Sequence, residues 1–317
     1  MARCLRPTIV LLVMALAAGV TPAAAQLNTQ HIKGMVGLKG GSLPPEHWYF
    51  IAPLIYVYNT DTIRNADGNK LPINASINSF AYAGGAMRVT SKKILGGDYA
   101  FQILFPVGVN NLLQGDEIDS NPGPGISDSA IVPIQLGWHG KRADAMASYL
   151  LYIPTGRYTD GASDNTGYGM WGHEISAGTT VYLTPSRQFH AATTISFTFQ
   201  SKKEDSDTQV GTAMNLEGGI GADFLAGGLT AGLSYYYSGK LTQDVIDGLP
   251  TFLQPGKGKV FALGPEATLV IAKNRTIYAL VKFNYFWETY ARITTQGRAF
   301  AITATFPFRP IKLPPAK

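Results

Sequence analysis

Residues 275–288, RTIYALVKFNYFWE, alternate apolar and polar side chains over most of their length. The apolar set is Ile277, Ala279, Val281, Phe283, Tyr285 and Trp287, and the other set is Thr276, Tyr278, Lys282, Asn284 and Glu288. Successive side chains of a β-strand point to opposite faces, so this stretch predicts a strand with one apolar and one polar face. Such a strand separates an apolar phase from water.

The same pattern recurs along the whole chain after residue 45. We expect strands at about 46–60, 76–90, 98–110, 129–139, 143–153, 170–183, 189–200, 212–224, 229–240, 259–271, 275–288 and 297–308. Beyond the first 25 residues, no stretch approaches the roughly 20 apolar residues that a membrane-spanning helix requires. The pattern therefore predicts an all-β transmembrane antiparallel barrel of about 12 strands.

The connections between these strands are alternately long and short. Polar links such as 60–74 and 111–127 alternate with short ones such as 140–142 and 225–228. In bacterial outer-membrane barrels the long loops face outward and the short turns face the periplasm. An even strand number then gives periplasmic termini, and the expected location is the bacterial cell outer membrane.

The first 25 residues have the features of a secretory signal peptide. Arg3 and Arg6 precede an apolar run, and Ala23-Ala24-Ala25 form a small-residue cleavage site. We expect four parts: a signal peptide at 1–25, an N-terminal segment and possible plug at 26–45, the barrel at 46–308, and a Pro-rich periplasmic tail at 309–317. The chain's single cysteine, Cys4, lies in the signal, which excludes a disulfide or a thiol nucleophile in the mature chain.

The formal net charge of +5 comes from 26 basic and 21 acidic residues, without a long basic run. This balance argues against a nucleic-acid-binding surface. A soluble β-sandwich or barrel is the competing fold, because it also alternates apolar and polar positions. Charged residues on the predicted inner face, such as Glu217 and Lys282, favour a hydrated lumen over a dry core.

Aromatic residues fall near the predicted strand ends, where amphipathic rings rest at the lipid headgroups. They are Trp48, Tyr49, Tyr99, Trp138, Trp171, Tyr182, Tyr285 and Trp287. The last strand alternates up to Phe306 and Phe308, as in the C-terminal recognition strand of assembled outer-membrane proteins. Membrane lipids and the barrel assembly machinery are therefore the expected partners.

Catalytic and metal sites receive little support from the sequence. No His lies two residues before a Ser, and adjacent His173 and Glu174 point to opposite faces of a strand. Acidic loop residues, Asp61 and Asp67 or Asp116, Glu117 and Asp119, form two candidate calcium sites, but solvated loop carboxylates are the commoner case. We predict no catalytic residue, no metal site and no cofactor.

The predicted inner face mixes acidic, basic and aromatic side chains. The lumen and substrate-path residues are Gln102, Gln135, Glu174, Tyr182, His190, Glu217, Asp223, Tyr236, Glu266, Tyr278 and Lys282. An ion-selective pore usually has charges of one sign, so the mixture favours a small neutral or aromatic solute. Internal hydrogen bonding without transport explains the same residues equally well.

Several segments resemble one family of outer-membrane proteins. They are Gly37 to Pro45 (GLKGGSLPP), Tyr56-Val57-Tyr58, Arg64 to Asn69 (RNADGN), Gly228 to Gly239 with Ser234-Tyr235-Tyr236-Tyr237, and Gly264-Pro265-Glu266. The chain is similar to the family grouped under the meta-pathway of phenol degradation. The resemblance implies a 12-stranded transporter-like barrel, associated in some members with uptake of aromatic or other hydrophobic compounds, and it implies no active site.

The sequence thus predicts a channel or transporter that passes small hydrophobic or aromatic compounds by passive diffusion through the lumen. Two alternatives stay open. One is a barrel enzyme acting on lipid or peptide, which would need His190 beside Asp or Ser side chains at an accessible surface. The other is a structural barrel without transport.

Overall fold

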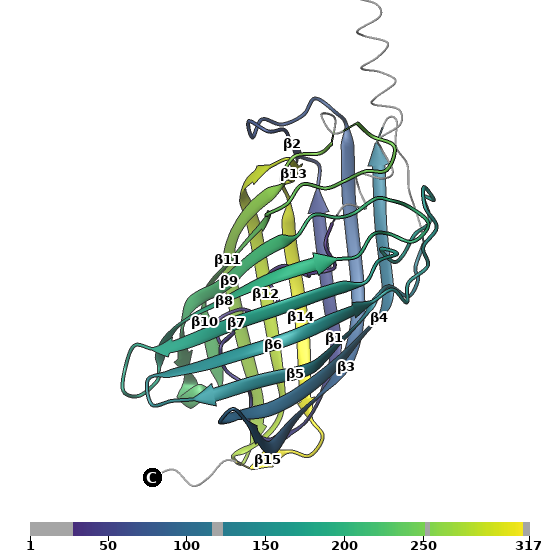
Figure 1. The fold of residues 1–317 in the computed structure, drawn as a ribbon. Coiled ribbons are helices and arrows are strands. Elements are labelled where there is room, and N and C mark those ends of the chain that lie inside the picture. Colours follow the sequence, from purple (N-terminus) through teal and green to yellow (C-terminus); the bar gives the residue numbers. More distant parts are fainter. Residues whose placement is uncertain (1–27, 116–122, 251–253, 313–317) are drawn as a thin grey trace, which may run out of the picture.

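The computed structural model describes residues 28–115, 123–250 and 254–312. They form a closed antiparallel barrel of twelve long strands (Figure 1). The strands are β1 (His47–Thr60), β3 (Ala75–Ile94), β4 (Gly97–Gly115), β5 (Ser129–His139), β6 (Ala143–Ile153), β7 (Gly172–Tyr182), β8 (Phe189–Gln200), β9 (Ala213–Phe224), β10 (Leu229–Lys240), β11 (Lys259–Lys273), β12 (Thr276–Arg292) and β14 (Arg298–Pro307). The predicted fold class is confirmed.

Each long strand pairs with its neighbour in the sequence, and β14 pairs with β1 to close the barrel. Closure removes the unpaired strand edges that a lipid phase cannot satisfy. There are three shorter strands: β2 (Ile63–Arg64) pairs with β13 (Thr294–Thr295) between two long loops, and β15 (Ile311–Lys312) pairs antiparallel with the first residues of β12. A single 3-10 turn, η1 (Leu225–Gly227), joins β9 to β10. Within the described residues, no helix is long and apolar enough to cross a membrane.

Several strand bounds agree with the predicted ones to the residue, but the β3–β4 hairpin is longer than expected. β3 ends at Ile94 and not near 90, and only Leu95 and Gly96, both with positive φ, form the turn. The polar run Ser91-Lys92-Lys93 resembles a turn in sequence. It is instead a strand that projects beyond the apolar band, where Lys93 pairs with Asp98 at 2.6 Å.

The outer face carries large apolar side chains that are exposed in the isolated chain. Examples are Phe50, Ile175, Ile220, Leu233 and Phe306. A surface of this kind is stable only against lipid, so these residues define the membrane-facing band. Trp48, Trp171 and Trp287 are also exposed, as expected for an aromatic girdle.

Tyr49 and Tyr182 do not belong to that girdle. Tyr49 is 2% exposed and Tyr182 is 7% exposed, and both take part in packing inside the barrel. The apolar core of the protein therefore lies in the lumen. One cluster there joins Tyr236 to Phe286, whose rings are 5.0 Å apart.

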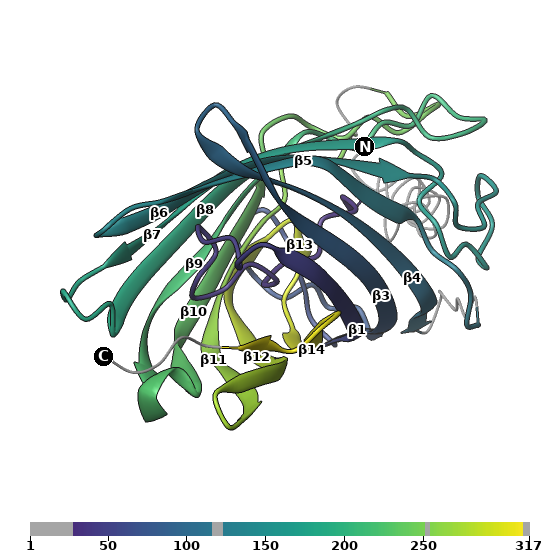
Figure 2. The ribbon, with the colours of Figure 1, turned by 90° about the horizontal axis from the view of Figure 1, so that it is seen from below.

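The barrel strands begin and end on the side of the short turns, as predicted (Figure 1). Residues 28–46, the described residues before β1, behave differently. They turn back into the barrel and run through its lumen, where Figure 2 shows them as the purple segment enclosed by the strands. The ends of the barrel thus lie on the short-turn side as expected, whereas Gln30 of the preceding segment lies at the opposite, long-loop end.

Candidate functional site

Residues 28–45, here called the inner segment, contact the wall along its whole length. At the long-loop end, the Gln30 side-chain amide donates hydrogen bonds to Asp128 Oδ2 at 3.0 Å and to the Met170 carbonyl at 2.8 Å. At the short-turn end, Ser42 Oγ donates to Asp144 Oδ2 at 2.8 Å. The inner segment therefore crosses the barrel from one mouth to the other.

The middle of the inner segment is fixed by two glutamates. His31 Nδ1 lies 2.8 Å from Glu174 Oε2 on β7, and His31 Nε2 lies 2.9 Å from Glu217 Oε1 on β9. Glu217 also accepts the backbone N–H groups of Gly34 at 2.8 Å and Val36 at 3.0 Å. One carboxylate thus holds three groups of the inner segment.

The contacts of His31 fix its charge. An ionised carboxylate can only accept hydrogen bonds, so both ring nitrogens donate only when the ring is an imidazolium. Burial opposes this charge, and the carboxylates of Glu174 and Glu217, one at each ring nitrogen, favour it. The two carboxylate contacts therefore favour the imidazolium form of His31.

Two glycines let the inner segment turn close to the wall. Gly34 and Gly37 have φ values of +81° and +76°, which other residues rarely adopt. A Cβ on Gly37 would lie 2.3 Å from the Glu266 carboxylate, and one on Gly34 would lie 2.5 Å from the Phe286 ring. This close approach places the Leu38 N–H 3.0 Å from Glu266 Oε1.

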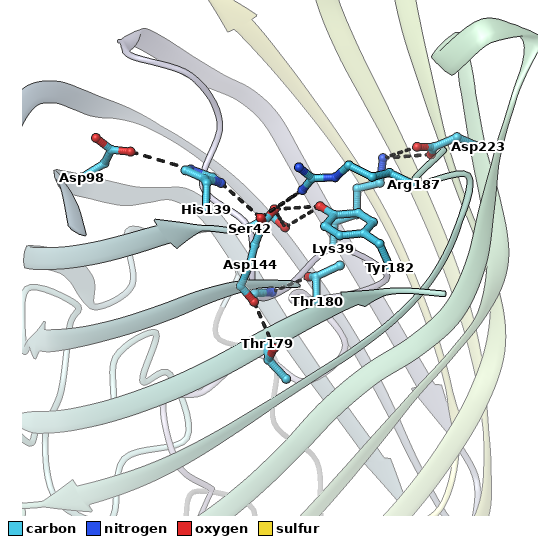
Figure 3. Close-up of polar contacts among 11 residues, drawn as sticks. Lys39, Ser42, Asp98, His139, Asp144, Thr179, Thr180, Tyr182, Arg187 and Asp223 are labelled. Atoms are coloured by element: carbon cyan, nitrogen blue, oxygen red, sulfur yellow. Dashed lines mark hydrogen bonds and ion pairs between the residues drawn. The ribbon is translucent and has the colours of Figure 1, made fainter. Parts of the chain in front are cut away.

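The lower end of the inner segment meets a polar network at the short-turn mouth, drawn in Figure 3. Asp144 is 2% exposed and accepts hydrogen bonds from Ser42, from the Tyr182 hydroxyl at 2.7 Å and from Arg187 at 2.9 Å. The Arg187 guanidinium also lies 3.7 Å from the centre of the Tyr182 ring. This satisfied buried carboxylate anchors the inner segment just before β1 begins.

A second contact in the same view joins Lys39 Nζ to Asp223 at 2.8 Å (Figure 3). The Lys39 side chain is 41% exposed, and such solvated ion pairs contribute about 0–1 kcal/mol. We expect Lys39→Ala to raise tryptic cleavage after Lys33 in the folded barrel by less than about fivefold, the factor that ~1 kcal/mol gives. A much larger increase would show that this pair dominates the anchoring.

Between the inner segment and the wall lies a cavity of about 730 Å³. Its lining reaches from Val109 and Tyr168 near the long loops to Pro44 and Tyr49 near the short turns. The volume falls within the range of pockets that hold small molecules. The cavity follows most of the barrel's length.

The two sides of this cavity differ in chemistry. Strands β1 to β6 contribute mainly apolar side chains, namely Ile51, Leu54, Tyr56, Ala83, Met87, Leu104, Ala130, Val132, Met146 and Leu150. Strands β7 to β9 contribute polar ones, namely Glu174, Ser176, Thr194, Ser196 and Glu217. Between its anchors at Asp128 and Asp144, the inner segment hydrogen-bonds to the polar side, which leaves the apolar side facing the free volume.

The structure distributes the eleven predicted lumen residues over several environments. Gln102, Gln135, Glu174, Glu217 and Lys282 line the cavity. Glu266 and Asp223 bind the inner segment, and Tyr182 belongs to the network around Asp144. His190 is fully buried near Gly221, and Tyr236 is fully buried with its hydroxyl donating to Glu288.

Tyr278 departs from the expectation. The pairing of β11 with β12 shifts register between Ile271 and Ala272, and Tyr278 has no partner across this bulge. Its side chain is 46% exposed and does not line the cavity. Alternation alone could not reveal the bulge, because the residues around it keep their apolar character.

Several important residues were not singled out from the sequence. His31, Asp144 and Asp128 each make polar contacts between the inner segment and the barrel. The position of Asp144 could have been inferred from the sequence, because a carboxylate directly after the tight turn at 140–142 must lie at the barrel mouth. His31 carried no comparable signal, because its partners are more than a hundred residues away.

The two groups of acidic loop residues that were weighed as calcium candidates lie in different parts of the chain. Asp116, Glu117 and Asp119 lie outside the described residues. Asp61 contacts Thr62 and Lys70, and Asp67 lies in a turn capped by the Asn65 side chain. In the part of the chain that the structure describes, no three His, Cys, Asp or Glu side chains are grouped to hold a metal ion.

The fold and the exposed apolar band define this protein as a bacterial outer-membrane β-barrel. A solved structure with the same architecture is the COG4313 outer membrane channel from Pseudomonas putida F1. It has a TM-score of 0.71 and 12% sequence identity, covering 88% of this chain and 100% of the channel. The beta domain of the autotransporter BrkA from Bordetella is a more distant match, at 12% identity and a TM-score of 0.49, over 83% of this chain and 100% of that domain.

Residues 60–304 match the model of the family described as "Putative MetA-pathway of phenol degradation", and the chain belongs to this family. The resemblance noted from the sequence is therefore confirmed. A search of curated proteins finds no match. At 12% identity, the likeness to the Pseudomonas channel establishes the fold alone.

Proposed function

We propose that this protein is a passive outer-membrane channel for small hydrophobic or aromatic compounds. The observation that carries the proposal is the cavity of about 730 Å³, whose free side is lined by apolar residues of β1 to β6. An apolar solute gains free energy on leaving water for such a surface. The lining extends toward both mouths, which gives the solute a continuous surface along which to move.

In this proposal the segment 26–45 is a plug that closes the polar side of the lumen. Its described part takes up the carboxylates of β7, β9 and β11, which would otherwise attract water and ions. The plug leaves the apolar side accessible. It thereby favours apolar solutes over sugars and salts.

The proposal includes no covalent chemistry. Ser42 and His139 both approach Asp144, but Ser42 Oγ donates to the carboxylate itself and not to the imidazole. A nucleophilic serine needs a hydrogen bond to its base. His190 faces the lumen and is fully buried, so it lacks the accessible surface that a lipid-cleaving site needs.

Residues 1–25 act as a signal peptide that is removed on export, and residues 309–317 lie on the periplasmic side. Membrane lipids surround the exposed apolar band, and the barrel assembly machinery inserts the chain.

The test is solute flux into vesicles containing the protein, with phenols, fatty acids and sugars as the panel and protein-free vesicles as the control. After subtraction of the flux through lipid, we expect phenols and short fatty acids to enter faster than sugars of similar size. Equal protein-dependent rates for all solutes, or no protein-dependent rate for any, would refute the proposed selectivity.

A further inference from the structure

We propose that a second, cation-selective pathway runs along the wall formed by β7, β9 and β11. The contacts of His31 hold the inner segment against this wall and keep the pathway closed, and displacement of the segment opens it. The inference goes beyond the channel for apolar solutes, which uses the opposite side of the lumen. The ligands of this second pathway are small monovalent cations.

The wall of the second pathway carries four carboxylates. They are Glu174 on β7, Glu217 and Asp223 on β9, and Glu266 on β11. Three of them are more than nine-tenths buried, and Asp223 has a side chain 23% exposed. A row of charges of one sign along a lumen is the usual basis of ion selectivity in channels.

The inner segment supplies the positive groups that face these carboxylates. Among the described residues, the ion-pair partners of the four are His31, which contacts Glu174 and Glu217, and Lys39, which contacts Asp223. Backbone N–H groups of the inner segment donate to the same wall. The inner segment thus occupies the places that cations and water would take in an open lumen.

The basic residue on the wall itself does not neutralise this charge. Lys282 on β12 donates to the Met35 carbonyl of the inner segment. Once the segment leaves, Lys282 loses that acceptor as well. A single lysine then remains near the wall against four carboxylates, so the wall is net negative in the displaced state.

His31 is the contact on which the closed state depends most. Its imidazolium is shared by two buried carboxylates from different strands, and both ring nitrogens are engaged. Removing one member of a buried charged network leaves an uncompensated charge, which is strongly destabilising. Without His31, Glu174 and Glu217 lose the cation between them and repel each other, and entry of water and cations relieves that repulsion.

The test compares purified full-length proteins in planar bilayers under a KCl gradient. We expect His31→Ala to raise the single-channel conductance about tenfold and to prefer K⁺ over Cl⁻ by about tenfold, each equivalent to ~1.4 kcal/mol. His31→Gln, which keeps the side-chain size but not the charge, should give the same result if His31→Ala folds poorly. Far-ultraviolet circular dichroism verifies the barrel in every variant.

Two further variants make the outcome decisive. In the triple variant His31→Ala/Glu174→Gln/Glu217→Gln, which keeps only Asp223 and Glu266 of the four carboxylates, the preference for K⁺ should fall well below that of His31→Ala. His47→Ala is the matched control, because His47 lies at the β1 entrance and contacts the Arg309 carbonyl, and it should behave as wild type. The proposal is overturned if the His31 variants conduct like wild type, if they pass K⁺ and Cl⁻ equally, or if the triple variant prefers K⁺ as strongly as His31→Ala does.

Discussion

Gly37→Val is expected to release the middle of the inner segment from the barrel wall. Gly37 has a φ of +76°, where a residue with a Cβ is strained by about 1–2 kcal/mol. The new side chain would also collide with the Glu266 carboxylate, which holds the Leu38 N–H and the Asn284 side-chain amide. Each buried hydrogen bond lost in this way costs about 1–3 kcal/mol.

Together, the backbone strain and the lost hydrogen bonds should increase the fraction of molecules whose inner segment has left the wall on the order of 10²-fold, since ~1.4 kcal/mol corresponds to a factor of ten. Tryptic cleavage after Lys33 in the folded barrel measures that population, because cleavage follows the fraction of open chain. Mass spectrometry of the products identifies the site.

Gly161→Val is the matched control for backbone strain. Gly161 has a φ of +72°, but a Cβ there meets no atom within 4 Å. It lies in the long connection between β6 and β7, away from the inner segment. Cleavage after Lys33 should stay at the wild-type rate in this variant. Equal cleavage in the two glycine variants would show that the Glu266 contact does not hold the segment.

Most of the barrel could be predicted from the sequence because its rules are local. A strand between lipid and lumen alternates with a period of two, and a short turn forces neighbouring strands to pair. Strands such as β8 and β10 therefore have the predicted bounds. The failures occur where register shifts, as at Tyr278, because a bulge changes the facing of a residue without changing its type.

The interior was less predictable because its contacts are distant in sequence. The alternating pattern correctly predicts that Glu217 points into the lumen. Its partners His31, Gly34 and Val36, however, precede it by about 180 residues. Similarly, nothing local distinguishes the acidic wall of β7 to β11 from the apolar wall of β1 to β6. Their separation emerges only when the strands close into a barrel around the inner segment.

Filling the apolar side of the cavity is expected to reduce uptake of apolar solutes sharply. Ala83 on β3 and Ala130 on β5 are small residues that line this side and are nearly buried. They lie close together, because their partners on β4 are Pro106 and Leu104. In Ala83→Trp/Ala130→Trp, two indole rings would occupy the free volume. An added barrier of ~1.4 kcal/mol would slow passage about tenfold.

The matched control places the same two side chains on the opposite surface of the wall. Ile220 and Leu233 face each other across β9 and β10 and are 64% and 55% exposed toward lipid. Ile220→Trp/Leu233→Trp adds equal aromatic bulk but leaves the cavity unchanged. It should retain wild-type flux, which separates a blocked path from general disturbance of the barrel.

The central claim, that apolar solutes cross beside the inner segment along β1 to β6, is tested most directly by protein-dependent phenol flux in these two double variants. The account predicts about a tenfold lower rate in Ala83→Trp/Ala130→Trp and the wild-type rate in Ile220→Trp/Leu233→Trp. Unchanged phenol flux in the folded cavity variant would contradict it.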